Sequence, residues 1–493
     1  MKNKYLIYLL SCLIYLSCSE DKGNYDYTPI DELEITGIKN TYTAVIGDSL
    51  DIPVTLKHTV DTKETDMSYN WEIDGKSVAN TKELHILPPS DLSFGNKLCR
   101  YTVTNVNTGM KYFQTFNTNI VSPFNWGYYF LTEKEDHSAI LSYFSVAEGN
   151  TKFIETTSVS GVEFGANPQQ IMGTFGYIST IKDYFWTMYI LTKDGKTPVI
   201  LTENATFIPS GTISTSNFVD QNSGYVFAPE EMRINRQGNP FFISKGQFIS
   251  YSKGVLYRPA KHDKKYEWSH PVFSQAGGSF MFVYDNLSHK YYVIKPQAND
   301  PSQGIIGDSY AYDQVIEISD CPDLQGHSII GTAPSMLGNK DFATIATANN
   351  QGIHLIKVAY DRKLTAGNLE SIETLPLTGT DTETKALITK QDWYFSVGNM
   401  IYTSPVLLPQ LNEFIEIPAE YGKIVNLGIS AMQTQLVVTT YDSKNPGEFK
   451  GSVIFIDITT KKMIPYKHVI HKCVSILGAN TDPYGWGDYG DGK

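Results

Sequence analysis

The feature that most limits the fold is a strand–turn–strand pattern that recurs along the chain from about residue 123 onward. In each copy, two short runs rich in β-branched or aromatic residues flank a turn segment, as in a β-hairpin. In one copy, Phe280–Tyr284 and Tyr291–Ile294 lie on either side of Asp285-Asn286. The copies span residues 130–144, 189–201, 248–257, 280–294, 342–358, 393–402 and 436–458.

These hairpins recur on average about every fifty residues, which is close to the period of a β-propeller. One four-stranded blade cannot bury both of its faces, whereas blades packed around an axis bury them and leave only short edges. The sequence therefore predicts an all-β, propeller-like domain of about seven blades over residues 122–480. The segments 171–181 and 308–318 would allow an eighth blade. A second sandwich plus a barrel is the alternative. No blade carries the Trp-Asp or the kelch double-glycine marker, so the propeller prediction depends on the spacing of the hairpins.

A small β domain is predicted before the propeller, over residues 31–121. Tyr69, Trp71 and Ile73 alternate along one strand and so share a face, and Asp74-Gly75 supplies a tight turn after it. Short strands at this spacing around one tryptophan indicate an immunoglobulin-like β-sandwich. We expect Trp71 to lie in its core rather than on a ligand-binding surface.

The N-terminus has the features of an export signal. Two lysines precede the apolar run Tyr5–Leu16, which is too short to span a membrane. Ser17-Cys18-Ser19-Glu20-Asp21 follows and resembles a bacterial lipobox with an acidic export tag. We expect residues 1–17 to be a lipoprotein signal peptide, Cys18 to be acylated, and residues 18–30 to form a flexible tether.

Three other interpretations of the N-terminus remain open. The run can be an ordinary signal peptide or an inner-membrane anchor, and Cys12 is a competing acylation site. Tyr15 also stands where a lipobox usually has Leu.

Composition and charge exclude several classes of function. The chain has 32 Tyr, 24 Phe and 6 Trp but only 19% charged residues, which favours a β-rich fold. The formal net charge of −12 argues against a nucleic-acid partner, because phosphate binding needs clustered Lys and Arg. Cys99, Cys321 and Cys473 are too widely spaced for a disulfide framework or a metal site, so we expect buried thiols.

Catalytic motifs are absent from the sequence. No metalloprotease, nucleophile-elbow, phosphate-loop or dinucleotide pattern occurs, so we expect no catalysis, no cofactor and no metal. His468 and His471 are three residues apart, so on a strand they would face opposite sides. Carboxylates from different blades can still form a glycosidase pair, so a surface glycan hydrolase with a propeller active site is the alternative. The tail 481–493 matches no calcium-binding loop.

Four aromatic residues near predicted turns are candidates for ligand contact: Trp186, Tyr266, Trp268 and Trp486. Exposed aromatic rings offer flat surfaces to sugars or peptide side chains at a small entropic cost. For each of them the alternative is packing between blades.

Two segments carry a family resemblance. The run Cys18-Ser19-Glu20-Asp21-Lys22-Gly23-Asn24-Tyr25-Asp26-Tyr27 resembles the start of PKD-like family lipoproteins of Bacteroidetes. The Tyr-x-Trp-x-Ile-Asp-Gly pattern at 69–75, followed by Tyr-Thr-Val-Thr at 101–104, is similar to a PKD-type immunoglobulin-like domain.

The resemblance implies a surface-exposed lipoprotein, anchored in the outer membrane through its lipid. The implied partners are a SusC-like TonB-dependent transporter and a SusD-like lipoprotein, and the implied ligand is an oligopeptide or a glycan taken up as a nutrient. The chain would bind that ligand, dock on the importer, or do both, without catalysis. A purely structural interaction scaffold is the remaining alternative.

Overall fold

The computed structural model describes residues 31–478 except for 46–47, 61–62, 89–94, 122–126, 146–152, 156–163, 179–182, 194–198, 204–208, 219–223, 235–239, 253, 258–263, 274–279, 296–313, 338 and 431–432. The chain splits into two compact units, residues 1–121 and residues 122–493. Within the described residues nearly all regular structure is β, which confirms the predicted all-β class. Short 3₁₀ helices occur at Glu64–Asp66, Thr215–Asn217 and Ala419–Tyr421. None of the described helices is long and apolar enough to cross a membrane.

The first unit is a β-sandwich built from one five-stranded sheet and two strand pairs. The larger sheet has the order β2-β9-β8-β5-β6, in which only β2 and β9 are parallel. The pairs β1-β4 and β3-β7 are antiparallel. The strands are β1 (Glu34–Thr36), β2 (Thr41–Val45), β3 (Leu50–Ile52), β4 (Thr55–Lys57), β5 (Met67–Ile73), β6 (Lys76–Ala79), β7 (Leu84–Ile86), β8 (Gly95–Asn105) and β9 (Lys111–Val121).

Trp71 fills the centre of the sandwich and is 1% exposed. Its ring centre lies 4.2 Å from that of Tyr101 and 6.0 Å from that of Phe116. Its indole Nε1 donates a hydrogen bond to the carbonyl of Thr81 at 2.8 Å, so burial leaves no polar atom of the ring unpaired. The expectation that Trp71 is a core residue is confirmed.

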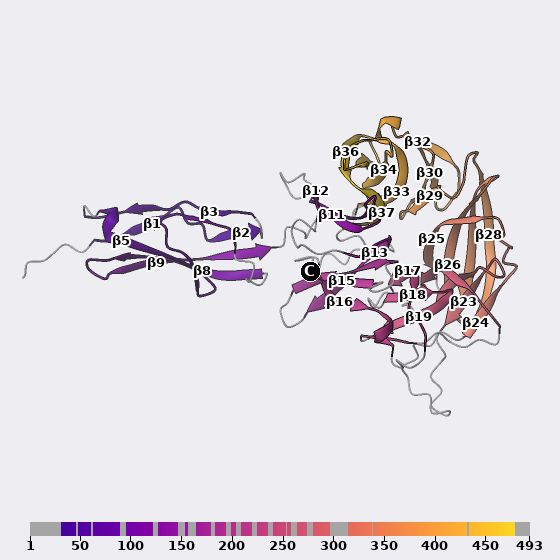
Figure 1. The fold of residues 1–493 in the computed structure, drawn as a ribbon, viewed down its shortest axis with the longest axis horizontal. Coiled ribbons are helices and arrows are strands. Elements are labelled where there is room, and N and C mark those ends of the chain that lie inside the picture. Colours follow the sequence, from indigo (N-terminus) through magenta and orange to yellow (C-terminus); the bar gives the residue numbers. More distant parts are fainter. Residues whose placement is uncertain are drawn as a thin grey trace, which may run out of the picture. The chain divides into compact units, whose positions relative to one another are not determined.

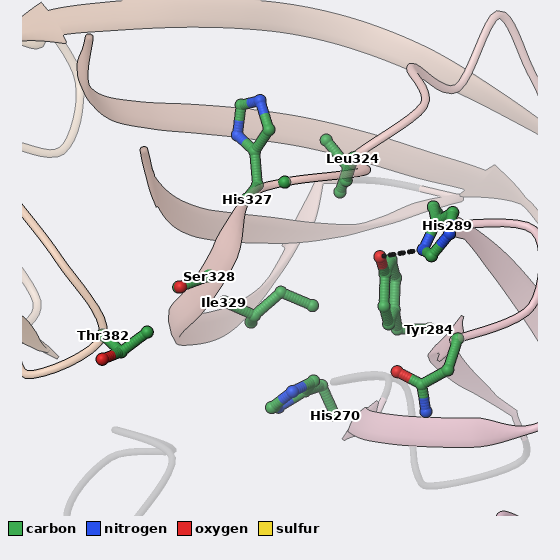
Figure 2. A pocket seen from close by; sticks show the side chains of 10 residues that line it. His270, Tyr284, His289, Leu324, His327, Ser328, Ile329 and Thr382 are labelled. Carbon is green, nitrogen blue, oxygen red and sulfur yellow. Dashed lines mark hydrogen bonds between the residues drawn. The ribbon is translucent and has the colours of Figure 1, made fainter. Parts of the chain in front are cut away.

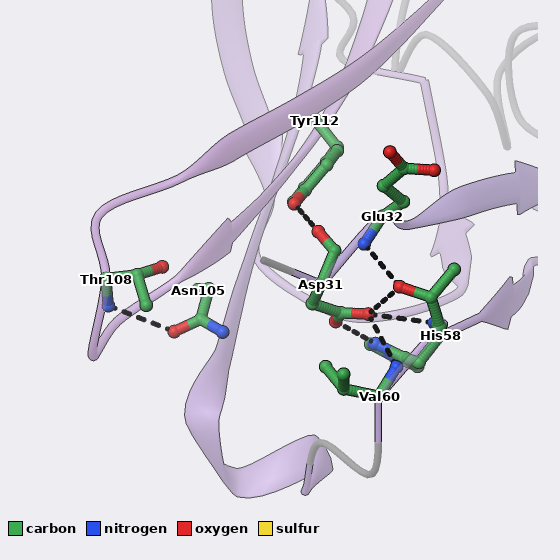
Figure 3. Close-up of polar contacts among 8 residues, drawn as sticks. Asp31, Glu32, His58, Val60, Asn105, Thr108 and Tyr112 are labelled. Carbon is green, nitrogen blue, oxygen red and sulfur yellow. Dashed lines mark hydrogen bonds and ion pairs between the residues drawn. The ribbon is translucent and has the colours of Figure 1, made fainter. Parts of the chain in front are cut away.

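Hydrogen bonds of Asp31 join the start of the sandwich to the segment that follows β4 and to strand β9 (Figure 3). Its carboxylate lies 2.6 Å from Nδ1 of His58 and accepts the backbone N–H of Thr59 at 3.0 Å. Its backbone carbonyl accepts the hydroxyl of Tyr112 on β9. These bonds tie three separate segments together at the point where the chain enters the domain.

The second unit is a propeller, and each blade is a four-stranded antiparallel sheet. We letter the strands of a blade A to D from the inside outward. From A to D, blade 1 contains β37 (Lys472–Gly478), β10 (Gly127–Glu133), β11 (Ala139–Ser145) and β12 (Phe153–Glu155); blade 2 contains β13 (Pro168–Ile178), β14 (Asp183–Thr192), β15 (Val199–Glu203) and β16 (Pro209–Ile213). Blade 3 contains β17 (Pro229–Ile234), β18 (Pro240–Ser244), β19 (Gln247–Ser252) and β20 (Val255–Leu256); blade 4 contains β21 (Trp268–Phe273), β22 (Met281–Asp285), β23 (Lys290–Lys295) and β24 (Gln314–Ser319); blade 5 contains β25 (Ser328–Leu337), β26 (Lys340–Asn349), β27 (Gly352–Asp361) and β28 (Ala366–Pro376). Blade 6 contains β29 (Lys385–Ile388), β30 (Asp392–Val397), β31 (Met400–Pro405) and β32 (Asn412–Glu416); blade 7 contains β33 (Lys423–Ile429), β34 (Gln435–Tyr441), β35 (Gly451–Asp457) and β36 (Met463–Ile470).

The ring of blades is closed by the C-terminal strand (Figure 1). The inner strands β37, β13, β17, β21, β25, β29 and β33 contact one another in that order, and β33 contacts β37 again. Seven buried apolar clusters of the described chain lie one between each pair of neighbouring blades. A Cβ on Gly428 of β33 would lie 3.1 Å from the side chain of Ile476 on β37, so glycine permits this close approach.

Seven blades are found in the described residues, and each predicted hairpin supplies two neighbouring strands of one blade. The two segments that would have allowed an eighth blade belong to existing ones. Segment 171–181 contains most of β13, and segment 308–318 contains most of β24. Blades 4 and 5 also join at their outer edges, where β24 runs parallel to β28 through the pairs Ile318↔Gly367 and Ser319↔Asn368.

Inner strands share a bulge that links each blade to the next. The register shifts within β13, β17, β21, β25 and β33 near their beginnings. The residue after the bulge carries the link in several blades: Gln170 accepts the N–H of Met232 at 3.0 Å, and Asn426 donates to the carbonyl of Val474 at 2.8 Å. In both cases the polar side chain of one inner strand satisfies a backbone group of the next inner strand.

The strand order divides the connections between two faces of the propeller. The inner strands begin at one face, which we call the front face, and end at the other, the back face. Because successive strands are antiparallel, the B–C turns and the D–A loops lie at the front face. The A–B and C–D turns lie at the back face.

Candidate ligand-binding cleft

A cleft of about 480 Å³ opens at the front face, beside blades 4 and 5 (Figure 2). Its walls come from the start of β21, the B–C turn after β22, the loop from β24 to β25, and the loop from β28 to β29. These segments lie far apart in the sequence. They meet because they share one face of neighbouring blades.

His270 lines the cleft from the bulge of β21. Its φ angle of 48° is a left-handed conformation, which is rare for a residue inside a strand. Both carboxylate oxygens of Glu231, on the inner strand of blade 3, lie 3.1 Å from the backbone N of His270. Glu231 therefore holds this strained backbone in place through a charge-assisted hydrogen bond. The His270 ring is 38% exposed and faces the cleft.

The B–C turn of blade 4 supplies Tyr284, Asn286 and His289 to the cleft. The hydroxyl of Tyr284 lies 3.4 Å from Nδ1 of His289, whose φ angle is 55° (Figure 2). Asp285, fully buried, accepts the N–H of Glu267 at 2.8 Å and the Ser288 hydroxyl at 2.6 Å. Because Asp285 fixes the turn, the cleft side chains stand on a rigid support.

His327 forms the wall on the blade 5 side and belongs to a histidine–amide network. Its Nδ1 lies 3.0 Å from Oγ1 of Thr347, and its Nε2 accepts a hydrogen bond from Nδ2 of Asn349 at 3.1 Å. Oδ1 of Asn349 lies 3.0 Å from Nε2 of His354, whose Nδ1 lies 3.1 Å from Oγ1 of Thr374. The two imidazole ring centres are 4.9 Å apart.

This network keeps the wall neutral. Burial lowers the pKa of His327, and burial together with the neighbouring His327 lowers the pKa of His354. An acceptor Nε2 on His327 also matches a neutral ring. At neutral pH the two rings therefore carry no charge beside the cleft.

The cleft lining is polar and uncharged apart from its histidines. Ser328 and Thr382 provide hydroxyls and Ile329 provides apolar surface, whereas Tyr284 and Leu324 border the cleft but are only 6% and 2% exposed. Among the described lining residues none is a carboxylate, lysine or arginine. The lining suits a neutral ligand with many hydroxyl or amide groups, and it offers no carboxylate pair for glycoside hydrolysis.

Two of the predicted ligand residues, Tyr266 and Trp268, do not line this cleft. Tyr266 and Trp268 stack on each other at 4.3 Å, and Tyr292 lies edge-on to both. Trp268 is 3% exposed and belongs to the apolar cluster between blades 3 and 4. The structure thus corrects the ligand-platform hypothesis for Trp268, because the packing alternative holds there. Tyr266 is half-buried, with Lys264 5.3 Å from its ring centre.

The other predicted site residues cannot be compared with the cleft. Trp186 lies on β14 opposite Phe175, but its side chain is outside the described residues. Cys18, with the signal peptide and tether, and Trp486, with the tail 481–493, are also outside the described residues.

The cysteines and paired histidines have structural environments. Cys99, Cys321 and Cys473 are free and buried, as expected, and burial raises the pKa of the Cys473 thiol to about 12. His468 and His471 have different acidic neighbours. His471 lies 3.1 Å from the Glu155 carboxylate, and His468 lies 3.8 Å from that of Asp442.

Sequence reasoning missed His270, His289 and His327. His270 lies in strand β21, and His289 and His327 lie in two different connections, so no spacing in the sequence links the three. The only local signal is the pair of turn-forming residues Asp285-Asn286, which predicts a hairpin but not a binding site.

Fold and cleft together define an all-β protein in which a β-sandwich precedes a seven-bladed propeller with a front-face cleft. The sequence profile of the PKD-like family matches residues 18–168, which include the sandwich and the first strands of the propeller. This N-terminal part of the chain is therefore PKD-like. No curated protein matches the sequence.

Solved structures of similar fold include two proteins from Bacteroidetes. A quinonprotein alcohol dehydrogenase-like protein of Bacteroides thetaiotaomicron matches with a TM-score of 0.44 and 11% identity, over 90% of this chain and 95% of that one. PorZ, a surface component of the type-IX secretion system of Porphyromonas gingivalis, matches with a TM-score of 0.38 and 9% identity, over 69% of this chain and 39% of that one. Yeast Hsv2, from Kluyveromyces marxianus, has a TM-score of 0.32 and 10% identity, over 60% and 74%.

Proposed function

We propose that this chain is a lipid-anchored surface protein whose propeller binds a neutral oligomer, best a glycan, in the front-face cleft without cleaving it. The observation that carries the proposal is the cleft lining. It combines hydroxyl, amide and neutral imidazole groups on fixed turns, with the edge of the largely buried Tyr284 side chain beside them. Sugars are recognised by such precisely placed neutral hydrogen-bonding groups.

An oligopeptide is the second ligand class and fits less well. Peptides carry charged termini and often charged side chains, and no described lining residue is a lysine, arginine or carboxylate that would pair with them. An uncharged peptide segment remains compatible with the same hydrogen-bonding groups.

The proposal also includes a lipid anchor at Cys18 and a transporter as the partner of the protein. Ser17-Cys18-Ser19-Glu20-Asp21 supports acylation at Cys18, and the PKD-like profile begins at residue 18. In this scheme the protein holds the oligomer beside a SusC-like transporter with its SusD-like lipoprotein.

Binding is tested by titration calorimetry against pooled neutral glycans and pooled oligopeptides. Thr382→Trp places a bulky ring in the cleft from an exposed loop residue, and Tyr284→Phe removes only a hydroxyl. We expect the first variant to abolish binding and the second to weaken it about tenfold, the effect of one lost hydrogen bond in a buried site. Thr115→Trp, at an exposed position on β9, is the matched control. Binding that survives Thr382→Trp would place the ligand elsewhere.

Anchoring and partnership need separate measurements. Metabolic labelling with a fatty-acid analogue should mark the wild type and not Cys18→Ala. Affinity capture from detergent-solubilised outer membranes should recover a TonB-dependent transporter. Absence of the label, or of any transporter, contradicts that part of the proposal.

A further inference from the structure

The most exposed large apolar side chains of the described chain gather at the back face of the propeller. Leu407 is 90% exposed, Leu408 80%, Leu337 76% and Leu364 73%, and no other large apolar residue among those described exceeds 66%. Leu337 ends β25 at the A–B turn of blade 5, and Leu364 lies in the C–D turn of the same blade. Leu407 and Leu408 lie in the C–D turn of blade 6.

Hydrogen bonds hold these turns against their neighbours. The backbone N and the Nε of Arg362 each donate to the carbonyl of Asn339 at 3.2 Å, which joins the two turns of blade 5. The N–H of Val406 donates to the carbonyl of Gln391 at 2.8 Å, which joins the two turns of blade 6. The inner strands β25 and β29 are in contact, so these turns belong to neighbouring blades and lie at the same face of the propeller.

Four exposed lysines lie in turns at the same face, on blades 5, 6 and 7. Lys363 precedes Leu364, Lys390 lies in the A–B turn of blade 6, and Lys461 and Lys462 lie in the C–D turn of blade 7; all four are exposed. We call the four leucines and these four lysines the leucine–lysine patch.

The acidic residues of the same turns are less exposed and already engaged. Asp361 accepts the N–H of Lys363 at 2.8 Å, Asp457 accepts the N–H of Thr460 at 2.7 Å, and Asp341 pairs with Arg362 at 3.0 Å. Asp392 is half-buried. The most exposed charged side chains of these turns are therefore lysines, on a chain whose formal net charge is −12.

We propose that the leucine–lysine patch rests on a bilayer surface that contains anionic lipid. The leucines enter the boundary between headgroups and acyl chains, and the lysines contact the headgroup phosphates with their stems lying along the apolar layer. The inference does not depend on the ligand of the cleft or on acylation of Cys18.

A lipid surface fits the patch better than a protein partner does. The leucines stand at turn tips with most of their surface in solvent, whereas energetic centres of protein interfaces favour Trp, Tyr and Arg and contain few Leu. An aliphatic tip surrounded by lysine is the combination that interfacial membrane contacts use. The front-face cleft then faces away from the bilayer and stays accessible.

The test is flotation of the chain with protein-free vesicles. Residues 19–493 include every residue that the structure describes and omit the apolar N-terminal run, which would bind lipid by itself. We expect binding to phosphatidylcholine vesicles that contain phosphatidylglycerol, and weaker binding to phosphatidylcholine alone. The double variant Leu407→Ser/Leu408→Ser should lower the partition coefficient by about tenfold or more, since each leucine loses its burial in lipid.

Charge reversal tests the second half of the patch. Lys363→Glu and Lys390→Glu should each lower binding at least about fivefold and weaken its dependence on salt. Leu98→Ser and Lys111→Glu, both at exposed sites on the sandwich, are the matched controls and should leave binding unchanged. No binding to anionic vesicles, equal effects of patch and control variants, or patch-dependent capture of an outer-membrane protein instead of lipid would each overturn the proposal.

Discussion

Replacing Glu231 by alanine is expected to loosen the bulge that carries His270 into the cleft. Both carboxylate oxygens of Glu231 lie 3.1 Å from the backbone N of His270, and that residue has a left-handed φ of 48°. A hydrogen bond to a charged group contributes about 1.5–3 kcal/mol, and an orphaned N–H costs about 1–3 kcal/mol. Because the Glu231 carboxylate is partly solvated, we expect a loss of about 2 kcal/mol in the free energy of unfolding.

The matched control is the preceding residue. Glu230→Ala removes the same charge one position earlier, from an exposed side chain, and should change the free energy of unfolding by less than about 0.5 kcal/mol. Glu231→Gln keeps an acceptor oxygen and should cost about 1 kcal/mol. Thermal unfolding of the propeller, with ligand affinity measured on the same samples, separates the three variants. Equal losses for Glu230→Ala and Glu231→Ala would refute the role assigned to the bulge.

Three further predictions concern other parts of the fold. The pKa values of His327 and His354 lie below the ordinary 6.5, so these histidines take up protons at a higher pH in the unfolded chain than in the folded one. The stability of the propeller should therefore fall as the pH drops below 6.5, until the lowered pKa values are passed. In a series of thermal melts, His354→Gln should make that fall smaller. Native alkylation mapped by mass spectrometry should leave Cys473 unmodified until the propeller unfolds, because its pKa is about 12 and its thiol is buried. Trp71→Ala should destabilise the sandwich by about 3–5 kcal/mol while the propeller transition in calorimetry stays in place, and a shift of both transitions would contradict two independent cores.

The blade count could be predicted because each hairpin is local. The turn at Asp285-Asn286 and the strands on either side of it lie within a few residues, so turn chemistry and strand propensity act on the same short segment. The closure of the ring could not be predicted in this way. Nothing local in Lys472–Gly478 marks it as the partner of Gly127–Glu133, which lies more than three hundred residues earlier.

The bulges of the inner strands have a sequence pattern of their own, which the hairpin pattern does not include. Pro168-Gln169-Gln170 and Pro229-Glu230-Glu231 are short, similar segments that open two successive inner strands, and both place a polar side chain against the next blade. Comparing segments at the blade period would have found them. Trp268 illustrates the opposite error, because an aromatic residue close to a turn in sequence can still be the first buried residue of a strand.

The pairing of β37 with β10, which closes the ring of blades, affects how the protein folds as it is made. Blade 1 is complete only after residue 478 has been synthesised, because its inner strand is β37. Until then one edge of β10 has no partner strand, while the six later blades can form. Such an edge invites pairing with other chains. If the chain is exported as an extended polypeptide, the propeller cannot close until β37 has crossed the membrane. A product truncated before β37 would keep an open ring with an unpaired strand edge.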